Sequence, residues 1–255
     1  MSTKPDIPTE WVVVAGASGA IGTRIVERMR AKGFGIVAVG RREAALLALA
    51  DDSPDVVACA ADIETDAGAE TIAEAIPGPV RMMVNAAAAP MGGGVLEVDT
   101  DAILRAIDVK VNGTIRLVRA VEDHLVLDSR IVVISGNLGY DPIPEAATSG
   151  IGNAALANLM RQLSQALGPR GVTCHVVAPG PVWTERLQRL LADTARSRNV
   201  SEESVIEDYR KNSPIGHLVT IDEVAWAVEL HLAPEARAIA GTTLFVDGGQ
   251  RTSIP

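Results

Sequence analysis

Short apolar runs rich in valine and isoleucine recur along the chain, and longer stretches with helical periodicity separate them. Hydrophobicity within the runs is continuous, which is typical of strands that helices cover on both faces. The pattern predicts an α/β fold in which helices flank both faces of a doubly wound, seven-stranded parallel sheet. The predicted strands are Trp11–Ala15, Gly35–Val39, Val56–Ala60, Met82–Val84, Ile131–Ile134, Val172–Val177 and Thr243–Val246.

Composition narrows the class of protein. The chain has 255 residues, 47% of them hydrophobic, and no linker-like tract, so we expect a single domain over residues 1–255. The net charge of −9 comes without the clustered Lys and Arg that nucleic acids or anionic membranes require, so neither is an expected partner. Residues 1–10 are polar and no spanning segment follows, which favours a cytoplasmic location.

The cysteines and histidines do not point to a metal centre. Cys59 and Cys174 each lie in a short apolar stretch and are predicted to be buried thiols. The four histidines are scattered without the spacing of metal ligands. We therefore assign no metal site.

Two predicted helices carry a polar residue on their apolar side. Lys110 lies three residues after Ile107 in the helical stretch 100–125, and Asn153 lies three residues before Leu156 in the stretch 149–167. Both side chains are predicted to point inward. A buried lysine is costly unless it is paired or faces a cleft, so Lys110 calls for a ligand, a salt bridge between helices, or a stem that extends to water.

A glycine-rich turn, Gly16-Ala-Ser-Gly19-Ala-Ile-Gly22, joins the first strand directly to a helical stretch. Such a turn presents backbone N–H groups and the positive end of the helix dipole to a pyrophosphate, and glycine permits its close approach. Glycines alone are also compatible with a simple tight turn. The position between the first strand and a helix favours dinucleotide binding.

Further motifs follow in a fixed order, and together they resemble the short-chain dehydrogenase/reductase superfamily from end to end. Gly16 and Gly22 match its glycine motif, although Ala20 stands where the middle glycine usually lies. The resemblance implies a Rossmann-type domain and a nicotinamide cofactor. The cofactor-binding residues that it implies are Gly16, Ser18, Gly19, Ala20, Ile21, Gly22, Arg41, Arg42, Asp62, Ile63, Asn85, Ala86, Ala87, Asn153, Pro179, Gly180, Val182 and Thr184.

Gly40, Arg41 and Arg42 follow the second predicted strand and bear on the choice of cofactor. Members of the superfamily that prefer NAD(H) place an acid near this point to hold the ribose 2′-hydroxyl, and Gly40 takes that place here. Two guanidinium groups suit a 2′-phosphate through charge and bidentate hydrogen bonding. NADP(H) is therefore favoured over NAD(H), against the simpler interpretation that Arg41 and Arg42 begin a solvated helix.

The resemblance breaks at the catalytic residues, where the superfamily uses Asn, Ser, Tyr and Lys. Ser149 stands in the place of the Tyr and Asn153 in the place of the Lys, while Gly136 replaces the Ser and Lys110 replaces the Asn. A serine hydroxyl lacks the reach and the acidity of a phenol, so Ser149 cannot simply replace the tyrosine. All four positions of the tetrad differ, and lysine and asparagine have exchanged places.

The few remaining candidates for a proton donor define the functional hypothesis. Tyr140 follows a predicted strand end, where open α/β sheets place ligands, although it is equally compatible with a loop aromatic that packs on Pro142. We expect an NADP(H)-dependent oxidoreductase acting on a carbonyl or alcohol, with Lys110, Tyr140, Ser149 and Asn153 as candidate catalytic residues. The alternative is a nucleotide-binding pseudoenzyme or a redox-neutral enzyme for elimination or isomerisation.

The segment at about residues 184–214 resembles the superfamily's variable substrate lid. Its leucines Leu187, Leu190 and Leu191 stand beside charged residues, which predicts an amphipathic lid over a small, apolar carbonyl or alcohol substrate. The resemblance also implies a homodimer or homotetramer that assembles through the long helices containing Lys110 and Asn153.

Overall fold

A computed structural model describes residues 8–88 and 93–253, in which seven parallel strands form one sheet in the order β3-β2-β1-β4-β5-β6-β7. Each predicted strand is confirmed, and four of them extend by one or more residues at an end. The parallel, doubly wound arrangement predicted from the continuous apolar runs is confirmed as well. The strands are β1 (Trp11–Ala15), β2 (Gly35–Gly40), β3 (Val56–Ala60), β4 (Val80–Asn85), β5 (Leu125–Ile134), β6 (Thr173–Pro179) and β7 (Thr243–Val246).

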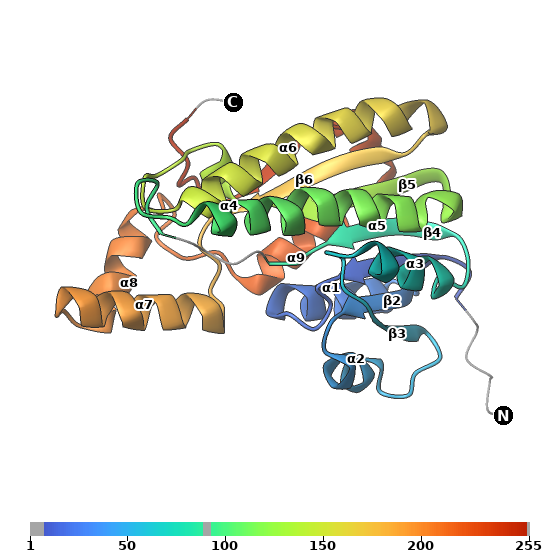
Figure 1. The fold of residues 1–255 in the computed structure, drawn as a ribbon, viewed down its shortest axis with the longest axis horizontal. Helices are drawn as coiled ribbons and strands as arrows, with labels where there is room; N and C mark the ends of the chain where they lie inside the picture. Colours follow the sequence, from blue (N-terminus) through green and yellow to red (C-terminus); the bar gives the residue numbers. More distant parts are fainter. Residues whose placement is uncertain (1–7, 89–92, 254–255) are drawn as a thin grey trace.

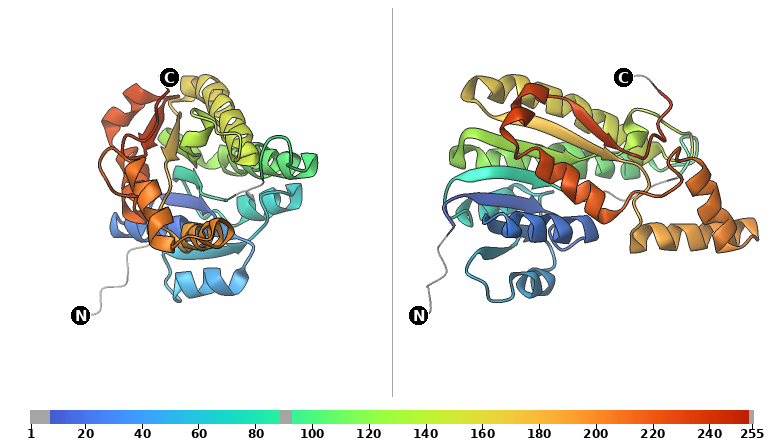
Figure 2. Two further views of the ribbon diagram at one scale, coloured as in Figure 1. Left: turned by 90° about the vertical axis from the view of Figure 1, so that its left-hand side faces the viewer. Right: turned by 180° about the vertical axis from the view of Figure 1, so that it is seen from behind.

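Helices cover both faces of the sheet (Figures 1 and 2). On one face lie α1 (Ala20–Ala31), α2 (Glu43–Ala50) and α9 (Ile221–Leu230). On the other lie α3 (Asp66–Glu74), α5 (Gly113–Val121) and α6 (Ala147–Leu167), with α4 (Thr100–Ile107) beside α6. Short 3₁₀ turns occupy Glu122–His124, Asn137–Gly139, Gly168–Arg170 and Pro234–Ile239.

Burial on both faces of the strands explains their continuous hydrophobicity. In β1, Val12 and Val14 join the core beneath α1 and α9, whereas Val13 and Ala15 join the core beneath α5 and α6. Successive strand residues point to opposite faces, so a strand that is covered twice has no polar side. Cys59 and Cys174 belong to the second core, and their predicted burial is confirmed.

The strand order reverses between β1 and β4, where the chain first winds outward through β2 and β3 and then returns to build the other half of the sheet. Two crossovers leave in opposite directions at such a switch point, and a crevice opens at the carboxyl ends of the strands. The glycine-rich turn that follows β1 lies at this crevice. The pair α7 (Glu185–Arg198) and α8 (Glu202–Lys211) projects from the same end of the sheet (Figure 1).

Residues 100–125 differ from the uninterrupted helix that their periodicity suggests. A π-helical segment, Asp108–Asn112, separates α4 from α5. The Thr114 hydroxyl donates to the Lys110 carbonyl at 2.6 Å and accepts from Asn85 Nδ2 at 2.8 Å, which ties this wider turn to the end of β4. Such π-turns alter the direction of the side chains that they carry, and Lys110 lies at the centre of this one.

No helix within the described residues is long and apolar enough to cross a membrane.

Candidate active site

The glycine-rich turn after β1 closes tightly against its neighbours. Gly16 has a φ of +77°, and a Cβ on it would lie 2.8 Å from the carbonyl carbon and oxygen of Ala86. A Cβ on Gly22 would lie 2.1 Å from the Gly16 oxygen. Any side chain at either position would push the turn away from the helix or the strand. The two glycines that match the superfamily motif are therefore required by the geometry.

The helix behind this turn begins without a side-chain cap. Gly19 is the N-cap of α1, and no side chain accepts a hydrogen bond from the first turn. The Gly19 N–H bonds to the Gly16 oxygen, while Gly19 and Ala20 are both exposed. A start of this kind leaves backbone N–H groups for an anion. The methyl group of Ala20 lies on the surface, so its replacement of the usual glycine leaves the turn closed.

The two arginines lie where β2 ends and α2 begins. Arg42 donates to the Ser18 carbonyl at 3.0 Å and to the Ser18 hydroxyl at 3.3 Å, so its guanidinium group lies against the glycine-rich turn. Arg41 is 69% exposed and makes one long contact, 3.5 Å, to Glu64. One guanidinium is thus held at the turn, and the other extends beside it from the same end of the sheet.

Residues after β3 and β4 complete this end of the crevice. The Asp62 carboxylate accepts from the Glu64 N–H at 3.0 Å, and the Ile63 side chain is buried against Gly113. Asn85 is buried, and its amide oxygen accepts from the Ala87 N–H at 3.0 Å. The Asn85 side chain therefore holds the strand end in shape, because both ends of its amide are bonded within the protein.

The segment after β6 leads from the sheet into the projecting helices. Pro179 ends β6, and the Gly180 N–H bonds to the Val246 carbonyl of β7. Val182 pairs with Val219, and Thr184 caps α7 by accepting from the Leu187 N–H at 3.3 Å. These bonds hold the segment at the carboxyl edge of the sheet.

Lys110 reaches the same edge from the π-helical segment. Its ammonium group donates to the carbonyl of Ile134, the last residue of β5, at 2.9 Å. Burial, together with the positive charge of Arg186, lowers the pKa of Lys110 to about 8. Within the described ranges, no carboxylate forms an ion pair with this amine. The predicted inward direction is confirmed, and the salt bridge that would have explained it is not seen there.

Asn153 lies on the buried face of α6, close to the position that Lys110 reaches. It is only 7% exposed, and the point where a Cβ of Gly136 would stand is 2.8 Å from its Nδ2. Gly136 follows β5 by two residues, so an amine and an amide both face the carboxyl end of that strand. Ser149 is half-buried one turn earlier on α6.

Tyr140 packs against β7. Its ring packs edge-on against Phe245 with the centroids 4.8 Å apart, and its hydroxyl hydrogen-bonds to Thr243 at the start of β7. Burial raises the pKa of Tyr140, although the bond to Thr243 and the charge of Arg251 oppose that shift. The phenol is thus engaged with the amino-terminal half of β7, whereas Lys110 and Asn153 face the carboxyl end of β5.

The two projecting helices form a small hairpin with its own core. Leu187 and Leu191 of α7 pack with Val205 of α8, and Leu190 and Tyr209 lie beside them. The leucines that suggested an apolar cover are thus used to hold α7 against α8. The hairpin occupies the carboxyl end of the sheet, where a lid is expected.

Comparison with known proteins agrees with this geometry. A family model described as enoyl-(acyl carrier protein) reductase matches residues 15–251. The chain belongs to this family of short-chain dehydrogenases/reductases. It is 28% identical to the short-chain reductase protein NovJ of Streptomyces niveus, over 98% of this chain and all of that protein. It is 25% identical to human L-xylulose reductase, over 93% and 95% of the two chains.

The fold is also that of solved members of the superfamily. One is a variant of the actinorhodin polyketide ketoreductase whose structure was determined with NADPH. It superposes on this chain with a TM-score of 0.87 at 24% sequence identity. The superposition covers 99% of this chain and all of the ketoreductase chain. Short-chain dehydrogenases/reductases use nicotinamide cofactors.

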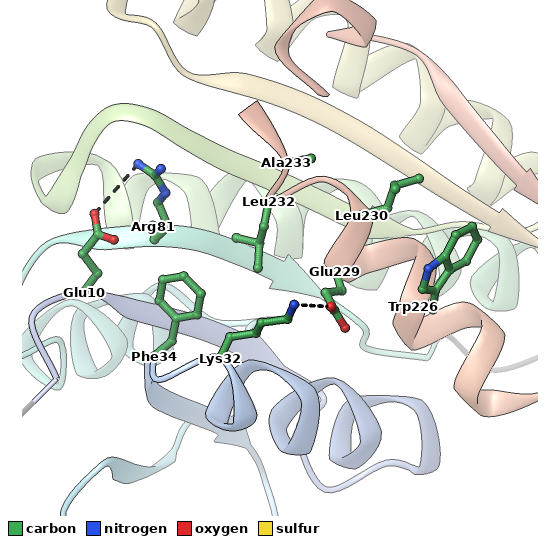
Figure 3. Close-up of a pocket in the computed structure, with 9 residues that line it drawn as sticks. All are labelled: Glu10, Lys32, Phe34, Arg81, Trp226, Glu229, Leu230, Leu232 and Ala233. Carbon is green, nitrogen blue, oxygen red and sulfur yellow. Dashed lines mark ion pairs between the residues drawn. The ribbon is translucent and has the colours of Figure 1, made fainter. Parts of the chain in front are cut away.

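A cavity of about 510 Å³ lies at the end of the sheet opposite the glycine-rich turn (Figure 3). Its charged groups pair with one another. Lys32 bonds to Glu229 at 2.8 Å, and Arg81 faces Glu10 at 3.8 Å. The cavity lies at the amino ends of β1 and β4, away from the glycine-rich turn.

Two residues of the site escaped prediction from the sequence. Thr114 anchors the π-helical segment, and Arg186 acts on the charge of Lys110. Thr114 could have been found as a threonine four residues after Lys110, in position to bond back to its carbonyl. Arg186 carries no local signal, because its effect depends on how the α7–α8 hairpin meets the sheet.

Proposed function

We propose that this protein is an NADP(H)-dependent oxidoreductase that acts on a carbonyl or alcohol substrate and uses Lys110 as its proton-transferring group. The observation that carries the proposal is the Lys110 amine, held 2.9 Å from the carbonyl of Ile134 at the carboxyl end of β5. Relatives named as reductases, among them NovJ and L-xylulose reductase, support the redox class.

The crevice fits a dinucleotide because Gly16 and Gly22 leave the turn free of side chains, and α1 begins uncapped behind it. The first-turn N–H groups would hold the pyrophosphate, and Arg41 and Arg42 would hold a 2′-phosphate. When bound, a nicotinamide cofactor supplies or accepts hydride. The protein's own task is then to orient the substrate and to move one proton to or from its oxygen.

A lysine with a pKa of about 8 suits that task. Near neutral pH the ammonium form can donate a proton to the oxygen of a carbonyl under reduction, and the neutral amine can accept one from an alcohol under oxidation. Burial, the main cause of the lowered pKa, also strengthens the interaction of the ammonium group with a developing negative charge. Tyr140 is a weaker candidate for the same role, since its hydroxyl is bonded to Thr243.

Removing both guanidinium groups should weaken NADPH binding far more than NADH binding. For Arg41→Ala/Arg42→Ala we expect the Kd for NADPH to rise about 10- to 100-fold, since each exposed charge-assisted bond to phosphate contributes on the order of 1 kcal/mol or more. The Kd for NADH, which lacks the 2′-phosphate, should change by less than about threefold. Fluorescence titration measures both.

Arg161→Ala is the matched control for the double variant. Arg161 lies on α6 and donates to the Gly241 carbonyl at 3.3 Å, so its loss should leave both dissociation constants unchanged. An equal loss of NADPH and NADH affinity in the double variant would mean that the arginines support the glycine-rich turn and do not bind the 2′-phosphate.

A non-redox role is the second candidate. The engagement of the Tyr140 hydroxyl with Thr243 favours it, because Tyr140 and Tyr209 are the only phenols in the chain and Tyr209 packs within the α7–α8 hairpin. Titration with NADPH and NADH, followed by turnover assays on aldehydes, ketones, β-keto esters and keto sugars, separates the two. Binding without turnover supports the second candidate, and the absence of binding contradicts both.

Exposed apolar residues on the long helices support assembly into a homodimer or homotetramer. Leu104 on α4 is 62% exposed and Ile151 on α6 is 40% exposed, and the two helices lie side by side. Large apolar side chains on one surface favour association. Light scattering should give the mass of a dimer or tetramer, and Leu104→Glu should shift it toward the monomer. A monomeric wild-type protein would contradict this assembly.

A further inference from the structure

Among residues 8–88 and 93–253, the structure shows no hydrogen bond to the side-chain amide of Asn153. The side chain lies on the inner face of α6, and the residue is 7% exposed. Its backbone carbonyl accepts from the Ser135 hydroxyl at 3.5 Å. The side-chain amide is not one of the fully buried polar atoms that lack a partner, so it keeps some accessible surface and is available to a ligand.

Two glycines pack closely against Asn153. A Cβ on Gly136 would lie 2.8 Å from Asn153 Nδ2, and a Cβ on Gly139 would lie 2.8 Å from Asn153 Cβ. Neither glycine is needed for its backbone conformation, because the φ of Gly136 is −174° and Gly139 is not among the residues with positive φ. The space at Gly136 therefore admits the Asn153 amide, whereas the space at Gly139 admits the backbone of α6, since Ala154 N lies 2.9 Å from that Cβ position.

The amide nitrogen lies near the carboxyl edge of the sheet. The same Cβ position on Gly136 is 3.8 Å from the carbonyl of Pro179, the last residue of β6. Lys110 reaches the adjoining carbonyl end of β5 through Ile134. An uncharged donor and an ammonium group thus converge between the carboxyl ends of β5 and β6.

We infer that Asn153 Nδ2 donates a hydrogen bond to the substrate's carbonyl or alcohol oxygen, and that the absence of a side chain at Gly136 admits the amide. The inference rests on the proposed function, in which Lys110 exchanges the proton with that oxygen. A fixed donor strengthens its bond as negative charge develops on the oxygen. Because the amide is neutral, it can donate this hydrogen bond beside Lys110 without lowering the pKa of the lysine further.

The test compares Asn153→Ala with Asn158→Ala. Asn158 is exposed on the same helix and accepts from Gln162 at 2.7 Å, so its loss should leave turnover unchanged. For Asn153→Ala we expect kcat for carbonyl reduction to fall about 100-fold, as for the loss of one donor to a developing oxyanion. The Kd for NADPH and the Tm should stay close to the wild-type values, because the amide bonds to no described protein group.

A second substitution distinguishes a donor from a space-filling group. Gly136→Ser alone should disturb the site, because its Cβ would meet the Asn153 amide at 2.8 Å. In Gly136→Ser/Asn153→Ala that conflict is absent, and the serine hydroxyl enters the space that the amide vacates. We expect the double variant to recover about tenfold in kcat over Asn153→Ala, since a hydroxyl donates as an amide does.

The outcomes separate this inference from the proposed function. Wild-type protein that binds no NADPH, or binds it and reduces no carbonyl, refutes the proposed function and the inference with it. Active wild-type protein refutes the inference alone if Asn153→Ala retains its kcat, if the variant loses NADPH affinity in proportion to activity, or if its Tm falls steeply. Loss of kcat with intact NADPH affinity, together with recovery in the double variant, supports it.

Discussion

Lys110→Met should lower kcat for NADPH-dependent carbonyl reduction by about 100- to 10,000-fold, the range typical of a lost general acid. Methionine keeps an unbranched side chain in the pocket but has no proton to give. The Kd for NADPH should change by less than about threefold, because the amine bonds to the Ile134 carbonyl and not to the glycine-rich turn. Steady-state kinetics and fluorescence titration measure the two effects separately.

The pH dependence gives an independent test of the same residue. With Lys110 as the acid and a pKa of about 8, the rate of carbonyl reduction should fall as the pH rises through that value, because the ammonium form is lost. Lys32→Met is the control, since Lys32 pairs with Glu229 at the far end of the sheet. Unchanged kcat in Lys110→Met would exclude Lys110 as the proton donor.

Acidification should destabilise the protein through His175. This residue is fully buried, and burial together with the charges of His231 and Arg130 lowers its pKa to about 3. In the unfolded chain this histidine has a pKa of about 6.5 and is protonated below that pH, whereas in the folded protein it stays neutral. The free energy of unfolding therefore falls as the pH drops from about 6.5 toward 3. The total loss in the free energy of unfolding is on the order of 5 kcal/mol, and roughly half of this loss has occurred at pH 4.5.

Urea unfolding from pH 7.5 to 4.5, with His175→Gln beside the wild type, isolates this contribution. Glutamine can keep the bond that the ring nitrogen makes to Thr173 at 2.8 Å, and it does not titrate. The variant should therefore lose about 2 to 3 kcal/mol less than the wild type over this range. His217→Gln, which alters an exposed histidine beside Glu223, should follow the wild-type curve. Parallel curves for wild type and His175→Gln would contradict the assignment.

Local chemistry made much of the fold predictable. Continuous apolar runs indicated a sheet covered on both faces because strand residues alternate in direction, and the cores on either side of β1 have that composition. Gly16 and Gly22 were predictable because a turn that approaches both a strand and a helix excludes a Cβ. The inward direction of Lys110 and Asn153 was predictable from helical periodicity, because periodicity depends only on residues that are close together in the sequence.

Other features depend on contacts between distant parts of the chain. Tyr140 stands at a predicted strand end, yet its hydroxyl is bonded to Thr243, 103 residues later. The three leucines of the predicted lid segment lie in the small core between α7 and α8, a contact that their own sequence does not specify. Local sequence describes which side chains are apolar or polar, but not which of several surfaces each one meets.

The sequence by itself determined the parallel sheet, the glycine-rich turn at its switch point and the pair of polar residues that face inward, because each of these follows from local periodicity or local sterics. Only the tertiary structure decided that the Lys110 amine meets the Ile134 carbonyl and that the Asn153 amide lies beside Gly136. The physical reason is that both contacts join a helix to the end of a strand, and their geometry is set by how those elements pack.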